Sequence, residues 1–274
     1  MNKTFRFFAL FTVVLIAFSA CKKEDNPTEA DPTAGLNLIA QGNAVGSGAK
    51  VFIYSAATGL KTGYNPLYII LKDSATGAYL DDAHVHLTPM MDMGMMQHSA
   101  PYENPASEEA VGHLFPCSVT FIMPTMSGGS WSLDVEVHNH ATDREGAVSF
   151  DLTVTDPVKP TIKSFIAAHN GAKYFLALVQ PAKPIVGINN LEFALYKKAD
   201  MMNFPADSSL TIQFTPEMPT MGHGSPNNVN PTHKIAGHYT GKVNFTMTGL
   251  WRLNMDLFSG VNVADTTQSF DIEF

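Results

Sequence analysis

The chain has 274 residues and a formal net charge of −8, and its length accommodates two domains of ordinary size. The acidic balance argues against nucleic-acid binding, because that binding depends on neutralising phosphates with Lys and Arg. An acidic surface is compatible with cation capture.

The first twenty residues have the pattern of an export signal. Lys3 and Arg6 give a basic start, residues 7–18 are almost wholly apolar, and Ser19-Ala20-Cys21 closes the segment. This apolar run falls short of the roughly 20 residues that a membrane-spanning helix needs. The terminal cysteine resembles the bacterial lipoprotein class, in which Cys21 would carry the lipid. Removal of residues 1–20 takes away two positive charges and moves the net charge from −8 to −10.

The residues after the cysteine indicate how the chain is attached. Lys22-Lys23-Glu24-Asp25 resembles the surface-export signal of lipoproteins in the Bacteroidetes group, although an ordinary charged tether has the same composition. Residues 26–35 are too poor in apolar residues to fold, so we expect a flexible tether over 21–35. We therefore expect a lipid anchor in the outer membrane, with display on the cell surface as the further expectation.

The rest of the chain repeats itself. Residues 48–52 match 171–175, and residues 149–152 match 269–272. Two prolines between the copies forbid a continuous strand there. The predicted boundaries are 36–155 for the first domain, 156–160 for a Pro-containing linker and 161–274 for the second domain.

Within each copy the apolar residues alternate with polar ones. The segments 131–137 and 251–257 both follow this period of two, and no segment has the pattern of a long amphipathic helix. The alternation is typical of antiparallel strands with one buried face. We therefore predict an all-β chain of two tandem immunoglobulin-like β-sandwich domains. Trp131 and Trp251 are expected core residues, and Cys117 is expected to be a small buried residue without a disulfide.

The two copies agree best in a methionine-rich loop. Residues 87–98 correspond to residues 214–223, each with a Thr-Pro pair, several methionines and a histidine, and seven of the thirteen methionines after Met1 lie there. A Gly-His pair follows in each copy, at 112–113 and 237–238. Thioethers favour Cu(I) over Zn, Mg or Ca, and imidazole adds affinity. The predicted copper ligands are Met91, Met93, Met95, Met96, His98 and His113 in the first copy and Met218, Met221, His223 and His238 in the second.

The second copy resembles a known family. Thr-Pro-x-Met-Pro-x-Met-Gly-His at 215–223, Gly-His-Tyr at 237–239 and Gly-Leu-Trp-Arg-Leu at 249–253 are similar to the YtkA-like domain. That family is related to the FixH-type proteins found with copper-handling and cytochrome-oxidase genes. The first copy is a divergent relative, since Asp92 stands where the second copy has Pro219. The resemblance implies the fold more firmly than any activity.

Other histidines and the loop itself have plainer interpretations. His84, His86, His138 and His140 have no counterparts in the second copy, so we expect solvated or hydrogen-bonded side chains there. A Met-rich loop can also close one end of a sandwich or form an adaptable contact surface.

The sequence therefore predicts an envelope lipoprotein that binds copper or a related soft metal as a buffer, carrier or sensor, with a protein partner in copper handling. The alternative is a tandem immunoglobulin-like interaction module that binds a protein or glycan partner, with the Met-rich loops as packing or contact surface. An enzyme is not expected, because the chain has no Gly-x-Ser-x-Gly, no His-Glu-x-x-His and no phosphate-binding glycine loop.

Overall fold

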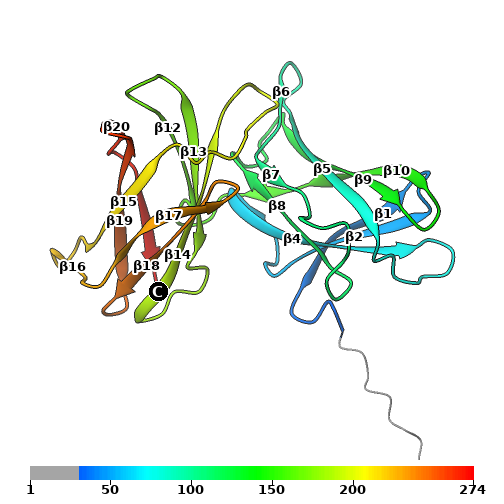
Figure 1. Cartoon of the computed structure of the whole chain (residues 1–274), viewed down its shortest axis with the longest axis horizontal. Coiled ribbons are helices and arrows are strands. Elements are labelled where there is room, and N and C mark those ends of the chain that lie inside the picture. The colour runs from blue at the N-terminus through cyan, green and yellow to red at the C-terminus, as the bar shows by residue number, and fades with distance from the viewer. Residues whose placement is uncertain (1–30) are drawn as a thin grey trace, which may run out of the picture. The chain divides into compact units, whose positions relative to one another are not determined.

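The computed structural model describes residues 31–274, so the predicted signal peptide, the lipidated Cys21 and most of the tether lie outside the described residues. The described part is all-β, with strands β1 to β21 and no helix (Figure 1). In residues 31–274 there is accordingly no helix long and apolar enough to cross a membrane. The predicted fold class is confirmed as two tandem immunoglobulin-like sandwiches.

The first sandwich consists of β1 (Asn37–Ala44), β2 (Ala49–Ser55), β3 (Leu60–Lys61), β4 (Gly63–Asp73), β5 (Ala83–Asp92), β6 (Gln97–His98), β7 (Tyr102–Glu103), β8 (Phe115–Phe121), β9 (Ser130–Asn139), β10 (Arg144–Leu152) and β11 (Val154–Thr155). One sheet has the order β1-β2-β4-β8-β7 and the facing sheet has the order β10-β9-β5-β6. Strands β3 and β11 pair in parallel at the end of the domain.

The second sandwich consists of β12 (Ile162–Ile166), β13 (Lys173–Gln180), β14 (Gly187–Lys197), β15 (Thr211–Met218), β16 (His223–Gly224), β17 (Val229–Ile235), β18 (His238–Phe245), β19 (Leu250–Ser259), β20 (Asn262–Asp265) and β21 (Ser269–Glu273). Its first sheet, β12-β13-β14-β18-β17, repeats the order of the first sheet in the first domain. In its second sheet, β16-β15-β19 with β21 on β19 repeats β6-β5-β9-β10, and β20 is an addition. The sequence repeat is therefore a repeat of topology.

Each domain has a core of its own. The buried apolar residues form one cluster between positions 44 and 154 and another between 165 and 272. Strand β9 buries alternate residues from Trp131 onward, and β19 does the same from Trp251. Both tryptophans are fully buried, as predicted. The apolar residues recur with a period of two because alternate side chains of a strand point to the same, buried face.

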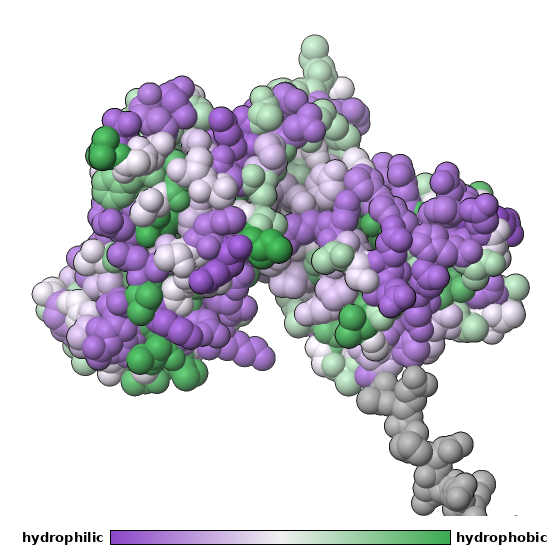
Figure 2. Space-filling model, in the orientation of Figure 1, coloured by the Kyte–Doolittle hydropathy of each residue, from purple (hydrophilic) through white to green (hydrophobic). Residues whose placement is uncertain are grey.

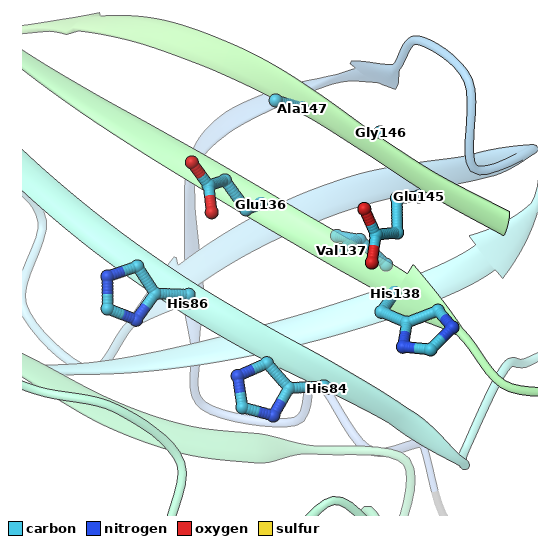
Figure 3. A pocket seen from close by; sticks show the side chains of 8 residues that line it. All are labelled: His84, His86, Glu136, Val137, His138, Glu145, Gly146 and Ala147. Carbon is cyan, nitrogen blue, oxygen red and sulfur yellow. The ribbon is translucent and has the colours of Figure 1, made fainter.

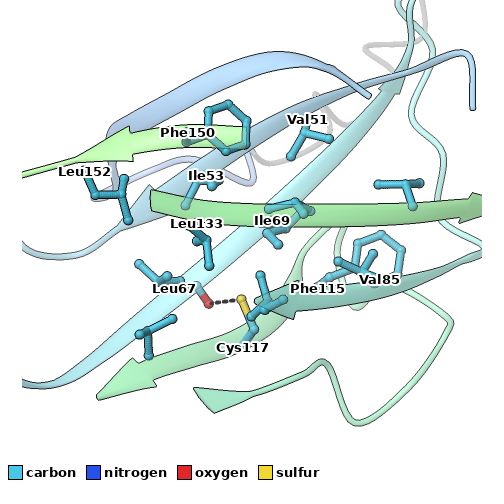
Figure 4. Packing of buried hydrophobic residues seen from close by; sticks show 14 of the residues in the cluster. Val51, Ile53, Leu67, Ile69, Val85, Phe115, Cys117, Leu133, Phe150 and Leu152 are labelled. Carbon is cyan, nitrogen blue, oxygen red and sulfur yellow. Dashed lines mark hydrogen bonds between the residues drawn. The ribbon is translucent and has the colours of Figure 1, made fainter. Parts of the chain in front are cut away.

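Cys117 lies in the first core, as predicted. Its Sγ donates a hydrogen bond to the Leu67 carbonyl at 3.6 Å, and Figure 4 shows it among the aliphatic side chains between the sheets. Burial raises the pKa of the Cys117 thiol well above its ordinary value. Cys117 is a free, buried cysteine, and it is therefore a packing residue.

An asparagine fixes the turn that leads into β4 and β14. Asn65 accepts a hydrogen bond from the Lys61 amide at 3.0 Å and donates to the Lys61 and Gly63 carbonyls, both at 2.7 Å. Asn189 makes the same set of bonds to Ile185 and Gly187. Both Gly63 and Gly187 have φ near +110°, at +108° and +109°, which favours glycine.

Two segments outside the strands bear on the predicted boundaries. Residues 32–35, the last part of the predicted tether, form a turn in which the Leu36 amide donates to the Thr33 carbonyl at 2.9 Å. A single turn needs no apolar residues, and the tether over 21–35 stays a prediction. Residues 156–160 contain no strand, as the two prolines require.

Candidate functional site

The two Met-rich loops have the same framework. In the first domain Met91 on β5 pairs with His98 on β6, and in the second Met218 on β15 pairs with His223 on β16. Met91 and Met218 are buried, because alternation along β5 and β15 turns them toward the core. The structure therefore brings together one buried methionine and one histidine at the base of each loop.

His98 has a defined tautomer in the first loop. Its Nδ1 lies 2.7 Å from the Ser99 carbonyl oxygen, which can only accept a hydrogen bond, so Nδ1 carries a proton. Its Nε2 lies 3.1 Å from the Sδ of Met123. A neutral imidazole has only one N–H, so the Nε2 lone pair faces the thioether sulfur. The ring also meets Trp131 edge-on at 5.5 Å.

The second loop repeats part of this arrangement. His223 Nδ1 donates to the Gly224 carbonyl at 3.0 Å, and its ring meets Trp251 edge-on at 5.9 Å. Trp251 Nε1 donates to the Met247 carbonyl at 3.0 Å. Trp131 makes the same bond to Met123 at 3.0 Å, so Met123 and Met247 are equivalent. Sequence reasoning missed both, because they lie outside the Met-rich loops.

The remaining loop methionines are separate from this base. Met93 is half-buried against the first core, whereas Met95, Met96 and Met221 are exposed. Met95 is fully exposed, at 103%. Figure 1 shows the β5–β6 loop extending beyond its sheet, and the corresponding projection in Figure 2 is pale green. Each loop therefore has a buried base and an exposed apolar tip.

His113 and His238 do not join these loops. His113 lies in a turn that precedes β8, stacks on Tyr79 at 3.8 Å and contacts Asp81 at 2.8 Å. His238 begins β18 and contacts Glu103 and Glu192. Both histidines lie at the sheet that faces the loop-bearing sheet, and both are hydrogen-bonded to carboxylates.

The two Gly-His pairs are also one residue out of register. The turn Gly112-His113 connects the paired residues Val111 and Leu114, whereas Ala236-Gly237 connects the paired residues Ile235 and His238. All four turn residues have positive φ, between +48° and +77°. The position equivalent to His113 is therefore Gly237, and the expectation that His113 and His238 are counterparts was wrong.

His238 forms part of a hydrogen-bonded cluster around Glu103. The carboxylate accepts hydrogen bonds from the hydroxyls of Tyr64 and Tyr196, both at 2.9 Å, and from His238 Nε2 at 2.8 Å. The bonds to Glu103 and Glu192 raise the pKa of His238 to about 9. Burial raises the pKa of Glu103, but the bonds from His238, Tyr196 and Tyr64 outweigh burial and hold it below its ordinary value. The cluster therefore holds His238 in its charged form between Glu103 and Glu192, which is a structural role.

The four unmatched histidines are hydrogen-bonded, as predicted. Figure 3 shows His84, His86 and His138 with Glu136 and Glu145 on three neighbouring strands, where they line an open depression of about 650 Å³. The histidine partners are Glu108 for His84, Asn104 for His86, Asp143 for His138 and Asp82 for His140. No three His, Cys, Asp or Glu side chains within residues 31–274 are arranged to hold a metal ion. Hard-metal and zinc sites of the usual kind are therefore not found there.

These observations define a tandem immunoglobulin-like β-sandwich protein. Within it, residues 168–256 match the family model described as YtkA-like. No curated protein matches the chain.

Three solved structures of surface proteins are similar to the chain. Domains 5–6 of the S-layer protein SbsC are 12% identical, with a TM-score of 0.28 over 86% of this chain and 98% of that one. The Yersinia pseudotuberculosis adhesin InvE is 12% identical, with a TM-score of 0.27 over 88% and 59%. Invasin, a bacterial integrin-binding protein, is 12% identical, with a TM-score of 0.22 over 87% and 38%. At these TM-scores the fold assignment rests on the strand order and register of the chain itself.

Proposed function

We propose that the chain is a tandem immunoglobulin-like interaction module whose Met-rich loop tips contact a protein partner. The observation that carries this proposal is the exposure of Met95, at 103%, on a tip that also exposes Met96. Met221 is 61% exposed on the equivalent tip of the second domain. Exposed apolar side chains that lie together, as Met95 and Met96 do, mark contact surfaces more often than single exposed ones.

The chemistry of the tips favours a protein over a glycan. Residues 93–96 and 219–222 contain methionine, glycine, proline and threonine but no aromatic side chain. Methionine is flexible and polarizable, and it adapts to apolar clefts on protein surfaces. The tips are also ordered, because the Met93 amide donates to the Met96 carbonyl at 2.9 Å and the Met221 amide to the Met218 carbonyl at 3.0 Å. An ordered loop loses little entropy on binding.

The proposal includes the location of this module. The export signal and Cys21 support attachment to the outer membrane by a lipid, with display at the surface. Absence of enzymatic activity belongs to the same proposal, because residues 93–96 and 219–222 include no carboxylate, imidazole, amine or thiol.

The test compares loop variants in a binary titration with a purified envelope partner. Met95→Ser with Met96→Ser, and separately Met221→Ser, should weaken binding at least tenfold while thermal unfolding stays unchanged. Met202→Ser is the matched control, because Met202 is 41% exposed but lies outside both loops. If all three loop substitutions leave the affinity for the partner unchanged, the tips are not part of the interface and the proposal is contradicted.

Binding of copper or a related soft metal is a second candidate function, favoured by one observation. The lone pair of His98 Nε2 faces the Met123 sulfur at 3.1 Å, and nitrogen and thioether donors together suit Cu(I). Such a protein would act as a copper buffer, carrier or sensor. The test measures how much Cu(I) the wild-type protein of residues 26–274 retains and compares it with the double variant His98→Ala/His223→Ala. Stoichiometric binding that the double variant loses is expected, and a wild-type protein that retains no Cu(I) would exclude this function.

A further inference from the structure

We infer that Met123 and Met247 each complete a site for a soft monovalent ion such as Cu(I), together with His98 and His223, and that the first-domain site fills first. The inference rests on the second candidate function and deepens it. Neither Met123 nor Met247 belongs to the Met-rich loops. Met123 follows β8 and Met247 follows β18, and both strands belong to the sheet that faces the loop-bearing sheet.

A neutral His98 has no proton to place between its Nε2 and the Met123 sulfur. His98 Nε2 and Met123 Sδ are 3.1 Å apart, and the single N–H of a neutral imidazole is used at the Ser99 carbonyl. Two lone pairs that face each other at this distance repel unless a cation lies to one side and binds both. A thioether binds a soft ion well and binds Zn, Mg or Ca poorly.

The surrounding structure holds His98 and Met123 in this arrangement. The Ser99 carbonyl at 2.7 Å fixes the rotation of the His98 ring. The Trp131 indole donates to the Met123 carbonyl at 3.0 Å and fixes the backbone that presents the sulfur. A hydrogen bond on the second ring nitrogen is the usual means by which a ligating histidine is oriented. His98 is 5% exposed while Met123 is half-buried, so the ion reaches the site past the thioether.

The two domains differ in how far this arrangement is formed. Trp251 fixes the Met247 backbone in the same way, and the Gly224 carbonyl fixes the His223 ring. Met247 is nevertheless 38% exposed, and within residues 31–274 no hydrogen bond links its sulfur to His223, whose Nδ1 bonds to Gly224. The second site must therefore fix an exposed thioether when the ion binds, which lowers its affinity. The first site needs no such ordering.

The competing explanation is a doubly protonated His98 that donates to both the Ser99 carbonyl and the Met123 sulfur. Titration of residues 26–274, which include the whole compact unit 32–274, with Cu(I) against a competing chelator separates these alternatives. Two classes of site are expected, and the methyl NMR signal of Met123 should shift with the first equivalent and that of Met247 with the second. This readout needs no variant and is unaffected by any folding defect.

Variants then assign the ligands. Met123→Leu keeps the side-chain volume, removes the sulfur, and should weaken the tighter site at least tenfold while the weaker one is unchanged. Met247→Leu should do the reverse. Met126→Leu is the matched control, because Met126 is an exposed methionine in the same segment. Two sites that survive Met123→Leu and Met247→Leu unchanged would overturn this inference and leave copper binding intact. A wild-type chain that binds no Cu(I) would overturn both.

Discussion

The methyl carbon of Met91 lies 2.7 Å from the position that a Cβ on Gly129 would occupy. The second domain repeats this relationship, with the methyl carbon of Met218 at 2.9 Å from the Cβ position of Gly249. The glycine two residues before each buried tryptophan therefore makes room for the methionine at the base of the loop.

Alanine at these glycines should destabilise the two domains unequally. Gly129→Ala displaces only the flexible end of Met91, and we expect a loss of about 0.5–1 kcal/mol, within the ordinary range for a single substitution. Gly249→Ala also places a side chain at φ +126°, which adds about 1–3 kcal/mol. Urea unfolding of both variants measures the difference, and equal losses would contradict the assigned role of the backbone angle.

Methionines at the base and at the tip of the loop should behave differently on truncation. Met91→Ala or Met218→Ala leaves a cavity in a core and should cost about 2–5 kcal/mol of stability. Met95→Ser changes a side chain that is 103% exposed, and its effect should stay within about 0.5 kcal/mol. Thermal unfolding of the three variants provides the comparison. A loss for Met95→Ser as large as that for Met91→Ala would show that the tip packs against the domain.

The stability of the chain should fall as the pH rises from about 6.5 to about 9. His238 has its pKa raised from 6.5 to about 9 by Glu103 and Glu192, so its charged form stabilises the folded state fully below the unfolded pKa. That stabilisation is lost through the window between the two values and is on the order of 3 kcal/mol, since one pKa unit corresponds to about 1.4 kcal/mol. Chemical unfolding at pH 6.5 and pH 9.5 measures the loss.

Two variants isolate His238 in that experiment. His238→Gln should be less stable at pH 6.5 and should lose much less stability than the wild type between the two pH values. His84→Gln is the control, because the His84–Glu108 pair is 56% and 60% exposed and contributes at most about 1 kcal/mol. If the His238→Gln protein shows the full wild-type decline, other groups cause it.

The thiol of Cys117 should be inert in the folded protein. Its side chain is buried, its Sγ donates to Leu67, and burial raises its pKa, so little thiolate is present at neutral pH. We expect no reaction with a thiol reagent in native buffer and one equivalent in denaturant, once Cys21 is absent from the protein tested. Rapid native labelling would mean that the first domain opens locally.

The fold could be predicted because burial on one face of a strand leaves a period of two in the sequence. The segments beginning at Trp131 and Trp251 show this pattern directly. The pairing of Met91 with His98 and of Met218 with His223 was also accessible, because each pair flanks a short hairpin loop. Alignment of the two loops therefore placed equivalent residues together.

The rest of the site could not be predicted from spacing alone. Gly112-His113 and Gly237-His238 have the same letters, but positive φ is required at residues 112–113 in one copy and 236–237 in the other. Met123 precedes its tryptophan by eight residues and Met247 by four. Because these spacings differ, comparison of the two copies did not show that the methionines are equivalent. A Phe-x-Met pattern at 121–123 and 245–247 was the available signal.

The division of each loop into a buried base and an exposed tip sorts its methionines by their susceptibility to oxidation. An oxidant in solution meets Met95 and Met221 first, because their sulfurs are exposed, whereas Met91 and Met218 are shielded by the core. Oxidation to the sulfoxide makes a methionine polar and is reversible by reductases. The apolar character of the tips can therefore be lost and restored without any change to the packing of either sandwich.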